Sequence, residues 1–203
     1  MDVITVTDDI EVFTCNAYLV LGEEPTLVDA GATPAVADAV AEHTDELSKV
    51  VLTHQHGDHI GGLDAICEAF EPDCYAYGEN DHRTQTLTDG ETIQLGDEPF
   101  EVVYTPGHAK DHISLYSDSA LFSGDLVVYN DGAFKDGSFG RTDYPGMSRE
   151  KLIESIRELL RRLPDTVETI YAGHGDVYSG DVRAVIERAL SRAERREPKY
   201  PEE

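Results

Sequence analysis

The sequence predicts an α/β fold, because short apolar strands alternate with helical segments and a histidine cluster directly follows a buried strand. The first strands are expected at Val3–Val6, Ala17–Leu21 and Leu27–Val28, the last closed by the turn Asp29-Ala30-Gly31. Pro34 is expected to begin a helix to about His43, since proline is tolerated in a first helical turn. Lys49–Thr53 is a compact apolar run typical of a buried strand, and Ile60–Phe70 has helical periodicity. The segment between them is therefore a strand-to-helix loop, where α/β sheets usually place their sites.

The middle of the chain is richer in strands, which Gly, Asp and Pro separate. They are expected at Cys74–Tyr77, Thr92–Leu95, Phe100–Thr105, His112–Ser117 and Ala120–Ser123. Asp131–Gly146 is glycine-rich and too long for a passive connection. Three further elements are a helix over Arg149–Leu163 capped by Ser148, a strand at Thr169–Ala172 and a helix over Asp181–Arg196. With no repeat or internal linker, residues 1–203 are expected to form one domain.

Composition narrows the class of partner. The 203 residues carry a formal net charge of −25, which repels nucleic acid phosphates and anionic membranes. We interpret this charge as adaptation to a high-salt cytoplasm; an acidic mesophilic protein is the alternative. No apolar run of about 18 residues and no secretory signal are present, so a cytoplasmic protein is expected. The cysteines Cys15, Cys67 and Cys74 are expected to be reduced and buried.

The sharpest chemical signal is His54-Gln55-His56-Gly57-Asp58-His59. In an extended segment, alternation places His54, His56 and Asp58 on one side, and the following turn brings His59 round. Two imidazoles can then hold one metal ion while a carboxylate and an imidazole reach a second. Such ligands suit zinc, iron or manganese better than calcium or magnesium.

Three more strand ends carry the same kind of residue. His108 ends Thr105-Pro106-Gly107-His108, Asp125 ends Ser123-Gly124-Asp125, and His174 lies within Gly173-His174-Gly175. Each alone is more often a turn than a ligand. Together with the first cluster they predict a metal site assembled from distant strand ends.

In their order along the chain, these residues resemble the metal-binding motifs of the metallo-β-lactamase superfamily, and the match spans nearly the whole chain. The resemblance implies a four-layer αββα sandwich with two divalent metal ions at one edge. It also implies the ligand roles: His54, His56 and His108 for the first metal, Asp58, His59 and His174 for the second, and Asp125 between them. Zinc is the expected metal, with iron or manganese as alternatives.

Within the superfamily, Thr53–Gly62, Thr105–His112 and Ser138–Asp143 look most like glyoxalase II and its compact relatives, which hydrolyse hydroxyacyl thioesters. The acidic residue at Asp125 departs from the antibiotic-hydrolysing lactamases, and His56 departs from the flavodiiron proteins. Glyoxalase II also has a C-terminal helical domain that helps to hold glutathione, whereas only 29 residues follow His174 here. The thiol carrier is therefore open.

Two alternatives are another small-molecule hydrolase of the same superfamily and, as the closest competitor, a persulfide dioxygenase that uses one iron. These enzymes share a Gly-Arg-Thr-Asp stretch like Gly140–Asp143, and the positions matching His54, His108 and Asp125 would bind their iron. Relatives of that kind tend to lack a histidine at the position of His112, which favours hydrolysis. A non-catalytic metal-binding protein would be expected to have lost a ligand, and all seven are present.

The expected mechanism uses a hydroxide shared by the two metals to attack the thioester carbonyl, with Asp58 and Asp125 as the catalytic carboxylates. The expected partner is a small-molecule thioester, and the oligomeric state is open. His112 is expected either to support the ligands, to line the pocket or to be a core histidine. Arg141 is expected to pair with Asp143 rather than with substrate. Tyr144 is expected to be a surface aromatic rather than a substrate contact, and His43 and His82 are expected to be ordinary surface residues.

Overall fold

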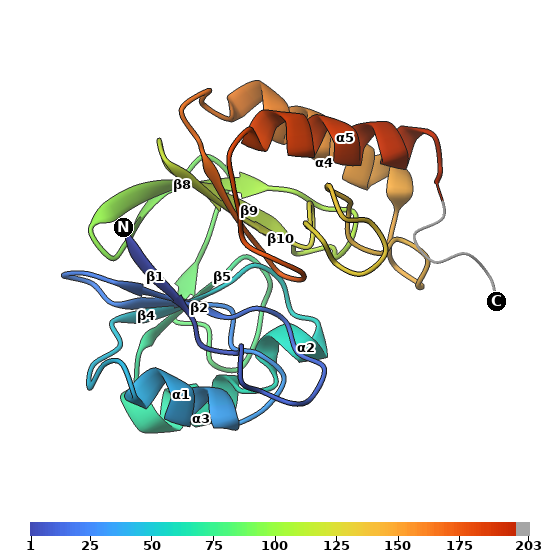
Figure 1. The fold of residues 1–203 in the computed structure, drawn as a ribbon. Helices are drawn as coiled ribbons and strands as arrows, with labels where there is room; N and C mark the ends of the chain where they lie inside the picture. Colours follow the sequence, from blue (N-terminus) through green and yellow to red (C-terminus); the bar gives the residue numbers. More distant parts are fainter. Residues whose placement is uncertain (198–203) are drawn as a thin grey trace. The chain divides into compact units, whose positions relative to one another are not determined.

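The structure is a computed structural model that describes residues 1–197, and the chain divides into two compact units, Met1–Val102 and Val103–Glu203 (Figure 1). Each unit has its own cluster of buried apolar side chains. Both clusters combine strand residues with residues from the helices of the same unit.

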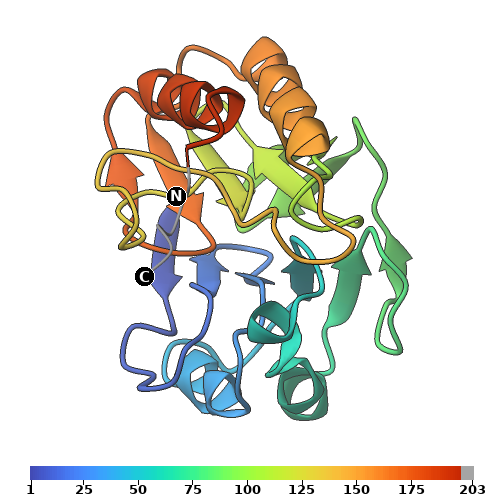
Figure 2. The same ribbon diagram turned by 90° about the vertical axis from the view of Figure 1, so that its right-hand side faces the viewer.

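The first unit is built on a six-stranded sheet with the strands in chain order. These strands are β1 (Asp2–Thr5), β2 (Tyr18–Leu21), β3 (Thr26–Val28), β4 (Lys49–Leu52), β5 (Asp73–Ala76) and β6 (Gln85–Thr86). The first three pair antiparallel, and from β3 to β6 the neighbours are parallel. Helices α1 (Ala35–Ala41) and α3 (Leu63–Phe70) lie side by side on one face (Figures 1 and 2). Every residue of β4 is buried, as expected for a strand that has a neighbour on each side.

The helical periodicity of Ile60–Phe70 corresponds to a helix over Leu63–Phe70, but the helix does not run unbroken from Ile60. The short helix α2 (Gly57–Ile60) and the helix α3 are separated by Gly61 and Gly62. A Cβ on Gly61 would lie 2.2 Å from the carbonyl oxygen of Ala32, and one on Gly62 would lie 2.4 Å from that of Ala30. The break therefore lets the chain after β4 pack directly against the backbone that follows β3.

The second unit holds strands β9 (Ile113–Tyr116), β10 (Ala120–Gly124), β11 (Thr169–Ala172) and β12 (Tyr178–Ser179). Its sheet has the order β12-β11-β10-β9-β8-β7, with β7 at Thr92–Leu95 and β8 at Glu98–Tyr104, and the boundary between the units falls within β8. Helices α4 (Arg149–Arg162) and α5 (Val182–Glu194) pack against each other (Figure 2). As predicted, Ser148 caps α4, accepting a hydrogen bond from the Lys151 amide.

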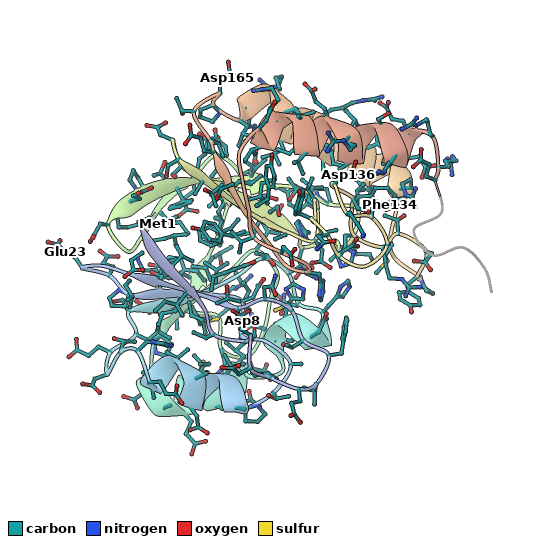
Figure 3. The ribbon with its side chains drawn as sticks, viewed as in Figure 1. Met1, Asp8, Glu23, Phe134, Asp136 and Asp165 are labelled. Atoms are coloured by element: carbon teal, nitrogen blue, oxygen red, sulfur yellow. The ribbon has the colours of Figure 1, made fainter. Side chains whose placement is uncertain are left out.

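The other predicted strands and helices are present, with bounds shifted by a few residues. The two-residue strands β6 and β12 were not predicted. All three cysteines are free, but Cys67 is only partly buried, contrary to expectation. No helix among residues 1–197 is long and apolar enough to cross a bilayer. Figure 3 shows outward-pointing side chains on many elements, and exposed carboxylates among them include Asp8, Glu23, Asp136 and Asp165.

Candidate metal centre

The first group of predicted ligands lies on the loop and short helix that follow β4. His54 and His59 are buried, and His56 and Asp58 are partly exposed. The expectation that Asp58 lies on an extended segment is wrong: the extended backbone ends at His56, and Asp58 lies in the first turn of α2. His59 nevertheless reaches the same side of the loop, since its ring centroid is 4.0 Å from that of His54.

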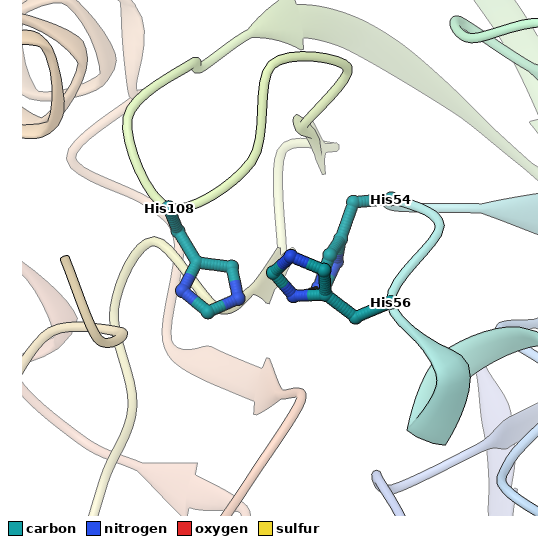
Figure 4. Close-up of side chains that lie close together, drawn as sticks. All are labelled: His54, His56 and His108. Atoms are coloured by element: carbon teal, nitrogen blue, oxygen red, sulfur yellow. Dashed lines mark hydrogen bonds between the residues drawn. The ribbon is translucent and has the colours of Figure 1, made fainter. Parts of the chain in front are cut away.

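Two ring nitrogens face each other on this loop. His54 Nε2 lies 3.0 Å from His56 Nδ1, with the rings nearly perpendicular at 85° (Figure 4). Two imidazoles bound to one tetrahedral zinc ion would have ligand nitrogens about 3.3 Å apart, given zinc–nitrogen bonds of about 2.05 Å. The His54–His56 pair is therefore close to the separation that a shared metal ion requires.

The orientation of His59 is set by Asp29, a residue that the sequence analysis treated only as part of a turn. His59 Nδ1 lies 2.8 Å from Asp29 Oδ2, so its other ring nitrogen, Nε2, is directed towards Asp58 Oδ2 at 4.0 Å. Asp29 also accepts hydrogen bonds from the amide of Thr53 at 2.8 Å and from its hydroxyl at 2.7 Å. A carboxylate behind a metal-binding imidazole is a common arrangement that fixes the tautomer and the ring plane.

Asp29 combines a polar side chain with a left-handed backbone, φ = 61°, at the end of a buried strand. That backbone conformation is uncommon for a non-glycine residue. The signal present in the sequence was an acidic residue directly after the predicted strand Leu27–Val28. Cys15 also lies close enough to Asp29 and His59 for one ligand atom of each to fall within 4.8 Å. Because both Asp29 oxygens already accept hydrogen bonds, we interpret this trio as the packing around His59 and not as a separate metal site.

The second group of predicted ligands lies at three strand ends of the second unit. His108 and Asp125 are buried, and His174 is partly exposed. One carboxylate oxygen, Asp125 Oδ2, lies 3.2 Å from His108 Nε2 and 3.6 Å from His174 Nε2. A single carboxylate between two imidazoles is the arrangement expected of a ligand shared by two cations.

His108 is oriented by the backbone of the glycine-rich loop. Its Nδ1 lies 2.8 Å from the carbonyl oxygen of Arg141 and donates to it, which leaves Nε2 as the ligand atom facing Asp125. The amide of Gly140 donates to the carbonyl of Asp125 at 2.8 Å. A Cβ on Gly140 would lie 2.0 Å from that same oxygen and 2.8 Å from His108 Nδ1, so the close approach requires glycine. This role of Gly140 was not predicted.

Around this group, Arg141 pairs with Asp143 through two hydrogen bonds of 3.0 and 2.6 Å, as predicted. The hydrogen bonds from Arg141 lower the pKa of Asp143. Tyr144 is exposed, and the guanidinium carbon Cζ of Arg141 lies over its ring, 4.3 Å from the ring centroid. His43 is exposed as expected, and the partly exposed His82 faces Asp64 at 2.6 Å.

The donor set fits a borderline transition metal. It consists of imidazole nitrogens and carboxylate oxygens. The rings of His59 and His108 are held in place because the Nδ1 atom of each is hydrogen-bonded, to Asp29 and to the Arg141 carbonyl respectively. Calcium and magnesium prefer all-oxygen sites, whereas zinc, iron and manganese accept this mixture. The structure thus brings four of the predicted ligands together in the first unit and three in the second.

Comparisons with known proteins point the same way. The family model described as the metallo-beta-lactamase superfamily matches residues 10–84 and 74–174. A hydroxyacylglutathione hydrolase from Aliivibrio fischeri is 33% identical over 152 residues, which cover 73% of this chain and 56% of that protein. The chain therefore spans about half the length of the curated relatives it matches.

Two solved structures are similar over most of the chain. ETHE1 from Myxococcus xanthus is 25% identical, with a TM-score of 0.70 over 91% of this chain and 87% of that one. The protein TTHA1623, in a di-iron-bound form, is 26% identical, with a TM-score of 0.67 over 88% of this chain and 98% of that one.

Proposed function

Since the chain belongs to the metallo-β-lactamase superfamily, we propose that it is a metal-dependent hydrolase of small hydroxyacyl thioesters, similar to glyoxalase II. Membership confirms the α/β metallo-β-lactamase fold predicted from the sequence. The observation that carries the proposal is the Asp125 carboxylate between two imidazoles, because a hydrolase of this kind needs one acidic ligand shared by two cations.

The proposed ligands are the seven residues named from the sequence. His54, His56 and His108 take the first ion, Asp58, His59 and His174 the second, and Asp125 contributes to both. Zinc is the proposed metal, with iron or manganese as alternatives; the similar protein TTHA1623 has been crystallised with two irons. We keep one domain over residues 1–203 as part of the proposal, because the sequence has no repeat or internal linker.

When bound, two such ions supply a hydroxide at neutral pH and polarise an acyl carbonyl, which is the chemistry that thioester cleavage needs. The chain itself contributes orientation. Asp29 keeps the proton of His59 on Nδ1, and the Arg141 carbonyl does the same for His108, so that both rings present Nε2. Asp58 and Asp125 are the proposed catalytic carboxylates, because both face these Nε2 atoms.

The cellular environment and the class of partner are also proposed, from the composition of the chain. A net charge of −25 argues against a nucleic acid or an anionic membrane as partner and is compatible with a salt-rich cytoplasm. A small thioester is the proposed substrate.

The test is hydrolysis of S-lactoylglutathione, followed by thiol release, with metal analysis of the same sample. We expect about two metal ions per chain and an activity that the Asp125→Ala variant loses by at least about a hundredfold. Asp118→Ala is the matched control, because Asp118 lies on the exposed turn between β9 and β10 and changes the same charge. Full activity in Asp125→Ala would refute the proposal.

The persulfide dioxygenase stays the second candidate, favoured by the Gly140–Asp143 stretch. Oxygen uptake with glutathione persulfide distinguishes it. One iron per chain with oxygen consumption and no thiol release from the thioester would reverse the assignment. The presence of His112 favoured hydrolysis in the sequence analysis.

A further inference from the structure

His112 lies where the ends of β8, β9 and β10 meet, next to Asp125. It is fully buried and immediately precedes β9. Its Nε2 lies 2.9 Å from the backbone nitrogen of Asp125, just after β10, and its Nδ1 lies 2.8 Å from Thr105 Oγ1, just after β8. The backbone also joins the ends of β8 and β9, because the Thr105 amide donates to the His112 carbonyl at 2.9 Å. The His112 ring thus links the end of β8 to the end of β10, where the proposed metal ligand Asp125 lies.

The partners of the ring fix its tautomer. A backbone amide can only donate, so Nε2 must accept from Asp125 and the ring proton must lie on Nδ1. Nδ1 then donates to Thr105 Oγ1, and the Thr105 hydroxyl donates to Ser114 Oγ at 3.2 Å. The Ser114 hydroxyl in turn donates to the carbonyl of Ser123 at 3.2 Å. Every hydrogen bond in this buried chain points the same way, so the neutral Nδ1–H form is the one that satisfies all of them.

One end of this chain of hydrogen bonds is the backbone amide of Asp125, the proposed ligand shared by the two metals. The amide of Asp125 is held by His112, and its carbonyl is held by the amide of Gly140 at 2.8 Å. With the backbone fixed on both sides, the carboxylate lies between His108 and His174. A shift of the Asp125 backbone would therefore move its Oδ2 away from both imidazoles.

We propose that His112 is a positioning residue that holds the Asp125 amide through Nε2 and thereby places the shared carboxylate. This inference rests on the proposed function only in taking Asp125 as a metal ligand. The competing interpretation is a core histidine that fills space. The two differ in which ring nitrogen matters, because space filling depends on volume and the positioning role depends on an acceptor facing Asp125.

Two substitutions separate the nitrogens. Glutamine can place its amide oxygen near the position of Nε2 and still accept from Asp125, whereas asparagine reaches only the position of Nδ1 and the Thr105 hydroxyl. In competition with a zinc chelator, we expect His112→Gln to bind zinc within about threefold of the parent and His112→Asn to bind it about 10- to 100-fold more weakly. Both variants are compared with the parent by circular dichroism and thermal melting.

A second readout does not need metal or activity. In the metal-free protein, hydrogen exchange of the Asp125 amide, followed by NMR, is expected to speed up at least about tenfold in His112→Asn and to change little in His112→Gln. Equal zinc affinity and equal exchange in the two variants would overturn the positioning role. So would a loss in His112→Gln as large as that in His112→Asn.

Thr105 provides an independent route if His112→Asn does not fold. Thr105→Val removes the acceptor of the Nδ1 proton and favours the other tautomer, which would set an N–H against the Asp125 amide. We expect zinc affinity about tenfold lower in Thr105→Val and unchanged in Thr105→Ser; equal affinities would refute the inference. If the parent protein binds zinc but does not cleave S-lactoylglutathione, the proposed function fails while these measurements still decide the role of His112.

Discussion

Replacing Gly140 with alanine adds one methyl group at the point where the glycine-rich loop supports two proposed ligands. The new Cβ would lie 2.0 Å from the Asp125 carbonyl oxygen and 2.8 Å from His108 Nδ1, so the backbone has to move. Overpacking of this kind costs about 1–3 kcal/mol, and loss of the Gly140–Asp125 hydrogen bond adds about 0.5–1.5 kcal/mol. The expected loss is about 1.5–4.5 kcal/mol, or about 3–18 °C in melting temperature for a chain of this length.

The functional loss should exceed what the folded fraction explains, because the movement displaces the carbonyl that accepts from His108. We expect zinc affinity to fall about 10- to 100-fold when measured by chelator competition on the folded variant. Gly57→Ala is the matched control, since that glycine lies in the other ligand loop and a Cβ there meets nothing within 4 Å. Parental stability and zinc affinity in Gly140→Ala would show that the loop does not support the ligands as described.

Three further predictions concern stability. Asp29→Asn keeps a residue that tolerates φ = 61° but sets an amide N–H against Thr53 or His59, and we expect a loss of at least about 2 kcal/mol in urea unfolding; a loss under about 0.5 kcal/mol would contradict it. The melting temperature should rise between dilute buffer and about 2 M KCl, because the Debye length falls to about 3 Å at 1 M and screens the charge of −25; a flat response would remove the argument for salt adaptation. Hydrogen bonds from Arg161 and Arg162 lower the pKa of Glu158 from 4.5 to about 2, so its small contribution is present above pH 4.5 and lost as the pH falls towards 2; Glu158→Gln should therefore reduce the acid dependence of unfolding in that window, and an unchanged slope would contradict this.

Much of the architecture was predictable, because the spacing of apolar residues indicates the strands and helices, and Gly and Pro indicate where they end. The apolar run before His54 and the proline and glycine before His108 indicate strand ends without reference to the rest of the fold. The break at Gly61 was missed because the apolar spacing continues through it, and only the distance to the Ala32 carbonyl reveals why no side chain fits there. Strands β6 and β12 have only two residues each, which is too short to show an alternation of apolar and polar residues.

The candidate site follows the same division. Its ligand residues carry their own chemistry and could be named from the sequence. The groups that orient these ligands could not be named from the sequence, because they are backbone groups that every residue possesses. The Arg141 carbonyl orients His108, and the Asp125 amide gives His112 its proposed role. Asp29 was overlooked because a turn explains it equally well until its distance to His59 is known.

The glycine pair at Gly61 and Gly62 has a consequence for anyone who wants to redesign the protein. At these positions the ligand loop rests on neighbouring main chain, so no side chain is available there to exchange for another. Mutagenesis should therefore leave the four ligands of this segment and both glycines unchanged, as well as Gly140 and Arg141, and sample the exposed positions Asp143 and Tyr144. Libraries that vary Gly61 and Gly62 are expected to return mostly inactive clones, and those that vary Asp143 and Tyr144 to return mostly active ones.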